Sequence, residues 1–166
     1  MQSMNLYLDT CVISGHAKGD LSADEVRAVT ELLSLYSTGK VSLVTSTVTK
    51  EEIDRIPEKY RAVHEETYEL LKSIQAIGYL VLDLGFGIHL LGVKRHSTYD
   101  DLRALLKDDD DAKHLYQAYR HGASHFLTVD SRTILSKASE IEKLCGVKPI
   151  LPSAFIGGRN NSSNAA

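Results

Sequence analysis

The chain has 166 residues, of which 43% are hydrophobic and 25% are charged, and its formal net charge is −3. These values are typical of one globular domain, and no apolar run approaches the roughly 18 residues of a membrane helix. The charge balance lacks the basic surplus of most nucleic-acid-binding proteins, and two cysteines, Cys11 and Cys145, are too few for a disulfide framework. A reducing, cytoplasmic location is therefore the simplest expectation.

The first half of the chain alternates short apolar runs, which predict strands, with apolar residues at every third or fourth position, which predict helices. Ser22 and Glu25 form the pattern of a capping box at the start of one helix, and Pro57 suits the start of another. In chain order, the expected elements are a strand at 4–8, a helix at 21–40, a strand at 41–45, a short helix at 50–56, a helix at 57–78 and a strand at 79–84.

The second half continues this alternation. In chain order, the expected elements are a short helix at 98–106, a helix at 111–121, a strand at 125–129, a helix at 134–145 and a strand at 147–151. Pro149 has no backbone N–H to donate, so the last strand is expected at an edge of the sheet. Residues 4–156 are expected to form a single domain, and the small polar residues at 157–166 a flexible tail.

Strands that alternate with helices predict an α/β fold, in which helices cover both faces of a central parallel sheet. Ligands of such sheets bind beyond the carboxyl ends of the strands. The acids expected at that edge are Asp9 after the first strand, Glu52 in the helix after the second, Asp111 at the start of the helix before the fourth, and Asp130 after the fourth. If the first and fourth strands are neighbours, these carboxylates meet in one crevice.

Each of these acids also has a structural explanation. Asp9 and Asp130 suit helix N-caps, and Glu52 completes a capping box with Thr49. The aspartate run at 108–111 suits the positive end of a helix dipole. Crowded carboxylates repel one another unless a cation neutralises them, however, and a site made only of carboxylates favours Mg²⁺ or Mn²⁺ over Zn²⁺.

Helical periodicity distinguishes among the four consecutive aspartates. Asp111 shares a helix face with Leu115, four residues later, and is expected to project toward the sheet. Asp108 lies about 4.5 Å further toward the helix start, where a cap is the better assignment. Asp109 and Asp110 share their faces with polar residues and are expected to face solvent.

Three more polar side chains lie close to these acids in the sequence. His114 is a weaker site candidate, because histidine is common at ordinary half-buried positions. Lys113 and Arg132 are candidates to hold phosphate groups, although residues of this kind are more often simply solvated.

Four segments resemble, in family order, the PIN-domain family of metal-dependent ribonucleases, which includes VapC-type toxins and stand-alone nucleases. The segments are "LYLDTCVI" (6–13), "STVTKEEIDRI" (46–56), "DAKHLYQAYRHGASHFLTVD" (111–130) and "KPILPSAFI" (148–156). The third is the most specific, with an Asp-Ala helix, a His/Gly turn, a strand and Thr-x-Asp. In the second, Glu52 rather than Glu51 matches the family, because the aliphatic Ile53 follows it.

The resemblance implies a three-layer α/β/α PIN-like domain and an endoribonuclease that uses Mg²⁺ or Mn²⁺ and leaves a 5′-phosphate. It implies that Asp9, Glu52, Asp111 and Asp130 are the catalytic metal ligands, with Thr10 and Thr128 as polar neighbours. It also suggests RNA as substrate, a role as the toxin of a toxin–antitoxin pair, an antitoxin protein as partner, and a homodimer.

Two other functions stay open at this point. In the first, the acids are helix caps, and a PIN-like module binds RNA or a protein without cutting. In the second, a phosphatase-like hydrolase uses Asp9 as its nucleophile, although "LDTC" lacks a second aspartate two residues later that could act as general acid.

Overall fold

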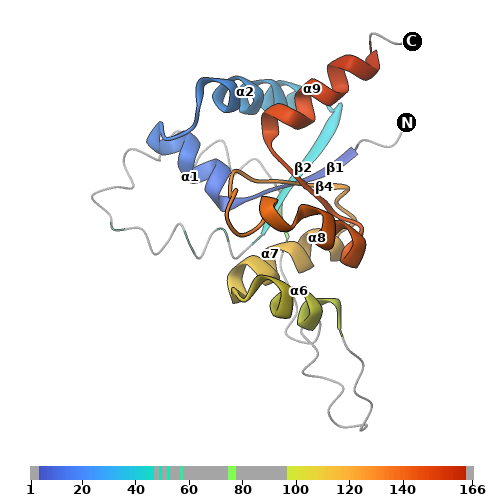
Figure 1. Ribbon diagram of the computed structural model, residues 1–166. Coiled ribbons are helices and arrows are strands. Elements are labelled where there is room, and N and C mark those ends of the chain that lie inside the picture. The colour runs from blue at the N-terminus through green and yellow to red at the C-terminus, as the bar shows by residue number, and fades with distance from the viewer. Residues whose placement is uncertain are drawn as a thin grey trace, which may run out of the picture.

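The computed structural model describes residues 4–46, 49, 52, 57, 75–77 and 97–163 (Figure 1). Its centre is a parallel sheet with the strand order β3-β2-β1-β4-β5. The strands are β1 (Met4–Leu8), β2 (Val41–Ser46), β3 (Gln75–Ile77), β4 (His125–Leu127) and β5 (Lys148–Ile150). The parallel sheet, the pairing of β1 with β4 and the edge position of β5 confirm the expectations from the sequence.

Helices lie between these strands and after the last one. They are α1 (Thr10–Lys18), α2 (Ala23–Ser37), α6 (Thr98–Leu106), α7 (Asp109–Arg120), α8 (Ala138–Cys145), which follows a 3₁₀ turn at Leu135–Lys137, and α9 (Pro152–Ser163). Within the described ranges, none of them is long and apolar enough to cross a membrane.

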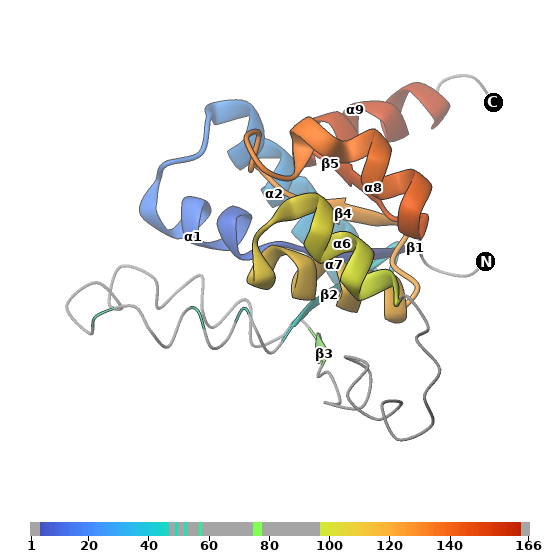
Figure 2. The same ribbon diagram turned by 60° about the horizontal axis from the view of Figure 1, so that its bottom comes forward.

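Two hydrophobic cores, one on each face of the sheet, make the fold a three-layer α/β/α arrangement (Figures 1 and 2). Side chains alternate along a strand, so Leu6 and Leu8 of β1 lie in one core and Tyr7 lies in the other. The first core includes residues of α1, α2 and α9, and the second includes residues of α6, α7 and α8. The fold class expected from the sequence is therefore confirmed.

Strand β3 lies where the sequence predicts the end of a helix. Residues 75–77 were assigned to the end of a helix, but they form β3 and pair in parallel with β2, with Gln75 beside Val44. The apolar spacing before Gly78 matched a helix, and the pairing with β2 overrides that local pattern. The expected strand at 79–84, and nearly all of the expected helix at 50–56, lie outside the described residues.

Helix α1 was not expected from the sequence. Its β-branched residues and Gly15 are poor helix formers. Val12 and Ile13 are buried in the core, however, and a Cβ atom at Gly15 would lie 2.7 Å from Cδ2 of Leu21. Burial of the apolar face and the close approach at Gly15 therefore stabilise this helix despite its composition.

Residues 157–163, expected as part of a flexible tail, belong to α9, which continues to Ser163, and the rest of that tail lies outside the described residues. Phe155 and Ile156 of this helix lie in the hydrophobic core, and a hydrogen bond to Glu25 connects the helix to α2. Ser22 caps α2 as expected, but the Glu25 carboxylate does not complete the capping box. It accepts hydrogen bonds from the N–H and the hydroxyl group of Ser153 in the first turn of α9 instead.

Replacing Glu25 with alanine is expected to lower the free energy of unfolding by about 1–3 kcal/mol, because two donors of Ser153 lose their acceptor. Urea denaturation monitored by circular dichroism measures this change. Glu31 is the matched control, since it is an exposed glutamate on the same helix and its replacement should change stability by less than about 0.5 kcal/mol. Equal effects of the two substitutions would show that the contact with Ser153 is not stabilising.

Candidate metal centre

Asp9 follows β1 and occupies the N-cap position of α1, but its side chain makes no capping hydrogen bond. Its Oδ2 atom accepts hydrogen bonds from Thr128 Oγ1, at 2.7 Å, and from Cys11 Sγ, at 2.9 Å. Thr128 also accepts a hydrogen bond from the backbone N–H of Asp130, at 3.1 Å. Thr128 therefore links two of the predicted site acids across the neighbouring strands β1 and β4.

Asp111 lies in the first turn of α7, where the sequence placed it. Among the described residues, no hydrogen bond or ion pair involves its carboxylate. Burial raises its pKa to about 7, and the negative charges of Asp108, Asp9 and Asp130 act in the same direction, against a smaller opposing effect of His114. A partly buried carboxylate without a partner and with acids around it has the electrostatic character of a cation site.

Asp108 is the N-cap of α7, as expected. Its Oδ1 atom accepts hydrogen bonds from the backbone N–H groups of Asp110 and Asp111, each at 3.0 Å. Asp130 makes a similar structural contact, because its Oδ1 atom accepts hydrogen bonds from the N–H groups of Arg132, at 2.9 Å, and Thr133, at 3.0 Å. Residues 131–134 form a turn and the next helical element begins at Leu135, so one oxygen of Asp130 is engaged in a turn, and Asp130 is not a helix N-cap.

Glu52 does not form the expected capping box with Thr49. Its Oε2 atom lies 3.3 Å from Nε2 of His114, and the hydroxyl of Thr49 is contacted by Thr10, at 3.0 Å. Burial would raise the pKa of Glu52, but the contacts with His114 and Thr10 outweigh it, so the pKa is lowered. Glu52 is therefore held ionised, which suits a metal ligand.

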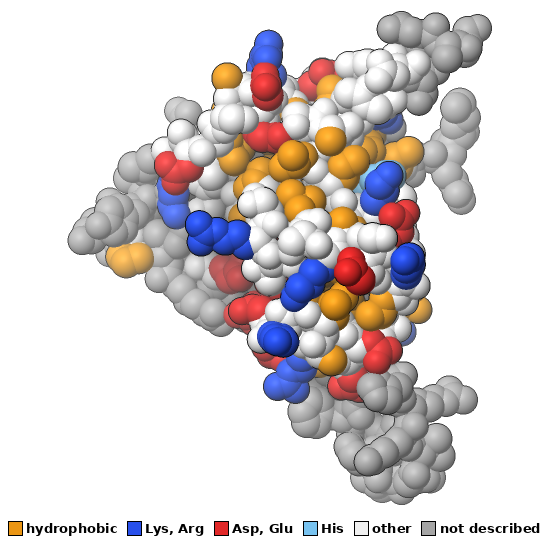
Figure 3. All heavy atoms as spheres, in the orientation of Figure 1, with side chains coloured by type: hydrophobic (Ala, Val, Ile, Leu, Met, Phe, Trp, Pro, Cys, Tyr) orange, Lys and Arg blue, Asp and Glu red, His pale blue; other side chains and the backbone are white. Residues whose placement is uncertain are grey.

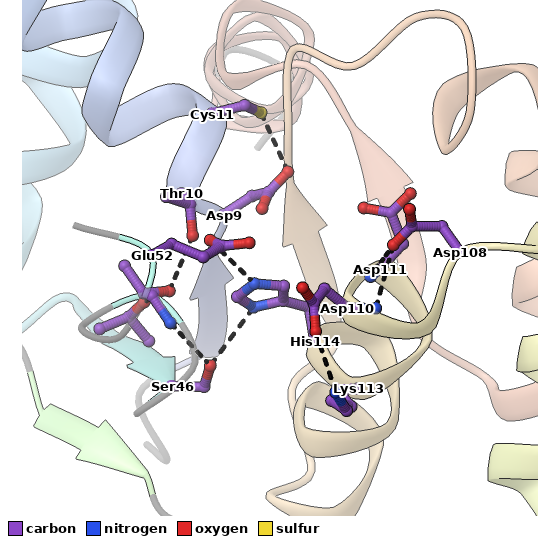
Figure 4. Close-up of polar contacts among 12 residues, drawn as sticks. Asp9, Thr10, Cys11, Ser46, Glu52, Asp108, Asp110, Asp111, Lys113 and His114 are labelled. Atoms are coloured by element: carbon purple, nitrogen blue, oxygen red, sulfur yellow. Dashed lines mark hydrogen bonds and ion pairs between the residues drawn. The ribbon is translucent and has the colours of Figure 1, made fainter. Parts of the chain in front are cut away.

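The face of α7 that carries His114 was expected to look toward solvent, and this was wrong. His114 and Gln117 are each 2% exposed. His114 reaches Tyr7, Ser46 and Glu52, and Figure 4 shows its ring extending from α7 toward Glu52. The helix is covered on this side as well, so both polar side chains are buried. His114 is hydrogen-bonded, whereas among the described residues neither polar atom of the Gln117 side chain has a hydrogen-bond partner.

The other charged residues at the start of α7 form ion pairs with one another and with α6. Asp109 accepts a hydrogen bond from Tyr99 and pairs with Arg103 and Lys113. Lys113 also pairs with Asp110, at 2.9 Å. Lys113 is therefore occupied by acids of its own helix, which weakens its case as a phosphate contact.

The predicted ligands have the chemistry that a hard divalent cation requires, but they do not lie in the geometry of a metal site. Asp9, Asp111 and Asp130 offer only oxygen atoms, the ligands that Mg²⁺ and Mn²⁺ prefer. Among the described residues, however, no three His, Cys, Asp or Glu side chains are gathered closely enough to hold an ion as they stand. Asp9, Asp111, Asp130 and Glu52 remain the ligands predicted from the sequence.

Mn²⁺ is expected to stabilise the protein more at about pH 8 than at about pH 6. The pKa of Asp111 rises from 3.8 to about 7 in the folded, metal-free protein. The folded state thus binds this proton more tightly than the unfolded state, and stability is lost as the pH rises from about 4 to about 7. A cation must displace the proton at the lower pH but not at the higher one. Thermal midpoints with and without Mn²⁺ measure the difference, and equal shifts at both pH values would contradict it.

Tyr7 belongs to this region although the sequence predicts only a buried strand residue there: its hydroxyl lies 2.6 Å from Nδ1 of His114. The available signal was its position two residues before Asp9, which places its polar tip in the core layer that contains α7.

No protein-family model matches the sequence, and no curated protein sequence is significantly similar to it. Solved structures do match. One is a chain in the crystal structure of VapBC2 from Rickettsia felis bound to a DNA fragment from its promoter. The TM-score is 0.59 and the sequence identity is 13%. The match covers 88% of this chain and 98% of that chain. At this identity the likeness shows the fold alone, and it agrees with the three-layer α/β/α arrangement.

Proposed function

We propose that this protein is a metal-dependent endoribonuclease that uses Asp9, Glu52, Asp111 and Asp130 to hold Mg²⁺ or Mn²⁺. The observation that carries the proposal is Asp111, whose carboxylate has no bonded partner among the described residues. Its pKa is raised by burial and by nearby acids that include Asp9 and Asp130. An acid with a purely structural role normally has a hydrogen-bond or ion-pair partner. The carboxylates around Asp111 instead repel one another, and a bound cation would offset this repulsion.

The residues of the chain have separate tasks in this proposal. Thr128 and Cys11 orient the Asp9 carboxylate through Oδ2. Arg132 is exposed two residues after Asp130 and can contact a phosphate of the RNA. On the face shown in Figure 3, basic side chains are scattered among acidic ones. When bound, the metal would activate a water molecule and offset the charge on the scissile phosphate.

The test uses a single-stranded RNA and a DNA of the same sequence, both in Mn²⁺. The RNA is expected to be cut internally, leaving 5′-phosphate ends, and the DNA to stay intact. An Asp9→Asn variant prepared in parallel controls for contaminating nuclease. Equal cleavage of the RNA and the DNA by the wild type would contradict the assignment to RNA. RNA cleavage by Asp9→Asn at the wild-type rate would contradict the proposed site.

A second candidate is a PIN-like module that binds RNA or a protein without cutting. It is favoured by the capping bonds of Asp108, by the turn bonds of Asp130 and by the open arrangement of the acids. RNA binding without cleavage at any Mn²⁺ concentration would support this function instead. The VapBC2 likeness also supports, as a proposal, a cytoplasmic toxin with an antitoxin protein as partner.

A further inference from the structure

His114 is a buried histidine whose two ring nitrogens both have partners. Nδ1 lies 2.6 Å from the hydroxyl of Tyr7 and 3.3 Å from that of Ser46. Nε2 lies 3.3 Å from Oε2 of Glu52. The ring therefore spans the distance from the hydrophobic core to one of the proposed metal ligands.

The partners determine where the ring carries its proton. An ionised carboxylate can only accept hydrogen bonds, so Nε2 must be the nitrogen that donates to Glu52. In the neutral ring Nδ1 is then an acceptor, which receives the hydroxyl proton of Tyr7 or Ser46. Burial strongly raises the pKa of Tyr7, so its hydroxyl stays protonated and can donate. In the charged ring Nε2 also carries a proton, so the contact with Glu52 persists in both charge states.

The position of the ring is fixed from the core. Tyr7 is fully buried and stacks on Phe126 of β4, with ring centroids 4.9 Å apart and an interplanar angle of 9°. Its ring also meets that of His114 edge-on, at 5.9 Å. Phe126, Tyr7 and His114 thus form a continuous rigid support that ends at Glu52.

We propose that His114 is a positioning residue, which holds the Glu52 carboxylate in place through its Nε2–H group so that Glu52 can serve the metal site. This inference rests on the proposed function for its catalytic consequence. An alternative is that His114 only fills and satisfies the core through Tyr7 and Ser46. The two roles use different ring nitrogens, so they can be separated by substitution.

Glutamine and asparagine separate these roles, because each amide mimics one nitrogen of the ring. In His114→Gln the amide N–H₂ can reach the place of Nε2 and still donate to Glu52. In His114→Asn the amide oxygen can replace Nδ1 and accept from Tyr7, but the contact with Glu52 is lost. We expect the Mn²⁺ concentration for half-maximal RNA cleavage to rise about 10-fold or more in His114→Asn and to stay within about threefold in His114→Gln.

Gln117 provides the matched control, because it is equally buried one turn later on α7. Gln117→Leu is expected to leave the Mn²⁺ requirement unchanged, whatever it does to thermal stability. A rise in the Mn²⁺ requirement that follows thermal stability across all three variants would overturn the positioning role. So would a larger rise in His114→Gln than in His114→Asn.

A second measurement is independent of cleavage. In ¹⁵N spectra of the metal-free wild type, the proton of the neutral His114 ring should reside on Nε2, and Glu52→Gln should shift this resonance. A proton on Nδ1, or a resonance unaffected by Glu52→Gln, would overturn the inference even in an active enzyme. Absence of RNA cleavage by a wild type with the expected spectrum would instead overturn the proposed function and leave the contact established.

Discussion

Replacing Asp111 with asparagine is expected to lower RNA cleavage by about 10³-fold or more, equivalent to about 4 kcal/mol of activation free energy. The same substitution should make the metal-free protein more stable. The wild-type carboxyl has a pKa of about 7, so ionising it in the folded state costs free energy that asparagine avoids. Loss of activity together with gain of stability is the signature of a residue kept for function.

Cleavage assays in Mn²⁺ and thermal melts at about pH 8 measure the two effects. Asp108→Asn is the matched control, three residues earlier in the same aspartate run. Asparagine is as good an N-cap as aspartate, so this variant should remain folded and within about tenfold of wild-type activity, or about 1.4 kcal/mol. Inactivity of Asp108→Asn with an active Asp111→Asn would reverse the assignment of these residues.

Chelation of divalent ions by EDTA is expected to abolish RNA cleavage, and Mn²⁺ or Mg²⁺ should restore it. The proposed ligands are all carboxylates, which bind hard cations and cannot by themselves activate a water molecule as strongly as a metal does. An ion that binds only the folded state also stabilises it, by about 2.7 kcal/mol at a concentration 100 times the dissociation constant.

Thermal midpoints test this second consequence. They should rise with millimolar Mn²⁺ in the wild type and much less in Asp9→Asn. Asp24→Asn is the control, because Asp24 is an exposed acid on α2 that pairs with Arg27, and it should keep the full shift. Full cleavage activity in EDTA, or an equal shift in Asp9→Asn, would place the chemistry or the ion elsewhere.

Much of the fold was predictable, because local and tertiary signals agree there. The strand at 4–8 matches β1, and the short helix at 98–106 matches α6, which begins with a complete capping box between Ser97 and Asp100. Prediction failed where burial overrides composition. Helix α1 contains β-branched residues, α9 contains two glycines, and β3 exists because β2 lies beside it.

The candidate site divides in the same way. The cap at Asp108 and the position of Asp111 were predictable, because the spacing of residues in the sequence determines which face of a helix each one occupies. His114 could not be assigned from the helix alone, because its face is buried by β1, β2 and Glu52. A sequence reports the period of a helix, but it does not report how many sides of that helix are covered.

The hydrogen bond from Thr128 to Asp9 joins residues that are 119 positions apart. Contacts of such long range form only after the intervening chain is available, and they slow folding. A ribosome-bound chain that has not yet released β4 lacks Thr128 and Asp130, and Asp9 then has neither its neighbour strand nor its orienting hydroxyl. The candidate centre therefore cannot assemble until β4 and Asp130 have emerged from the ribosome.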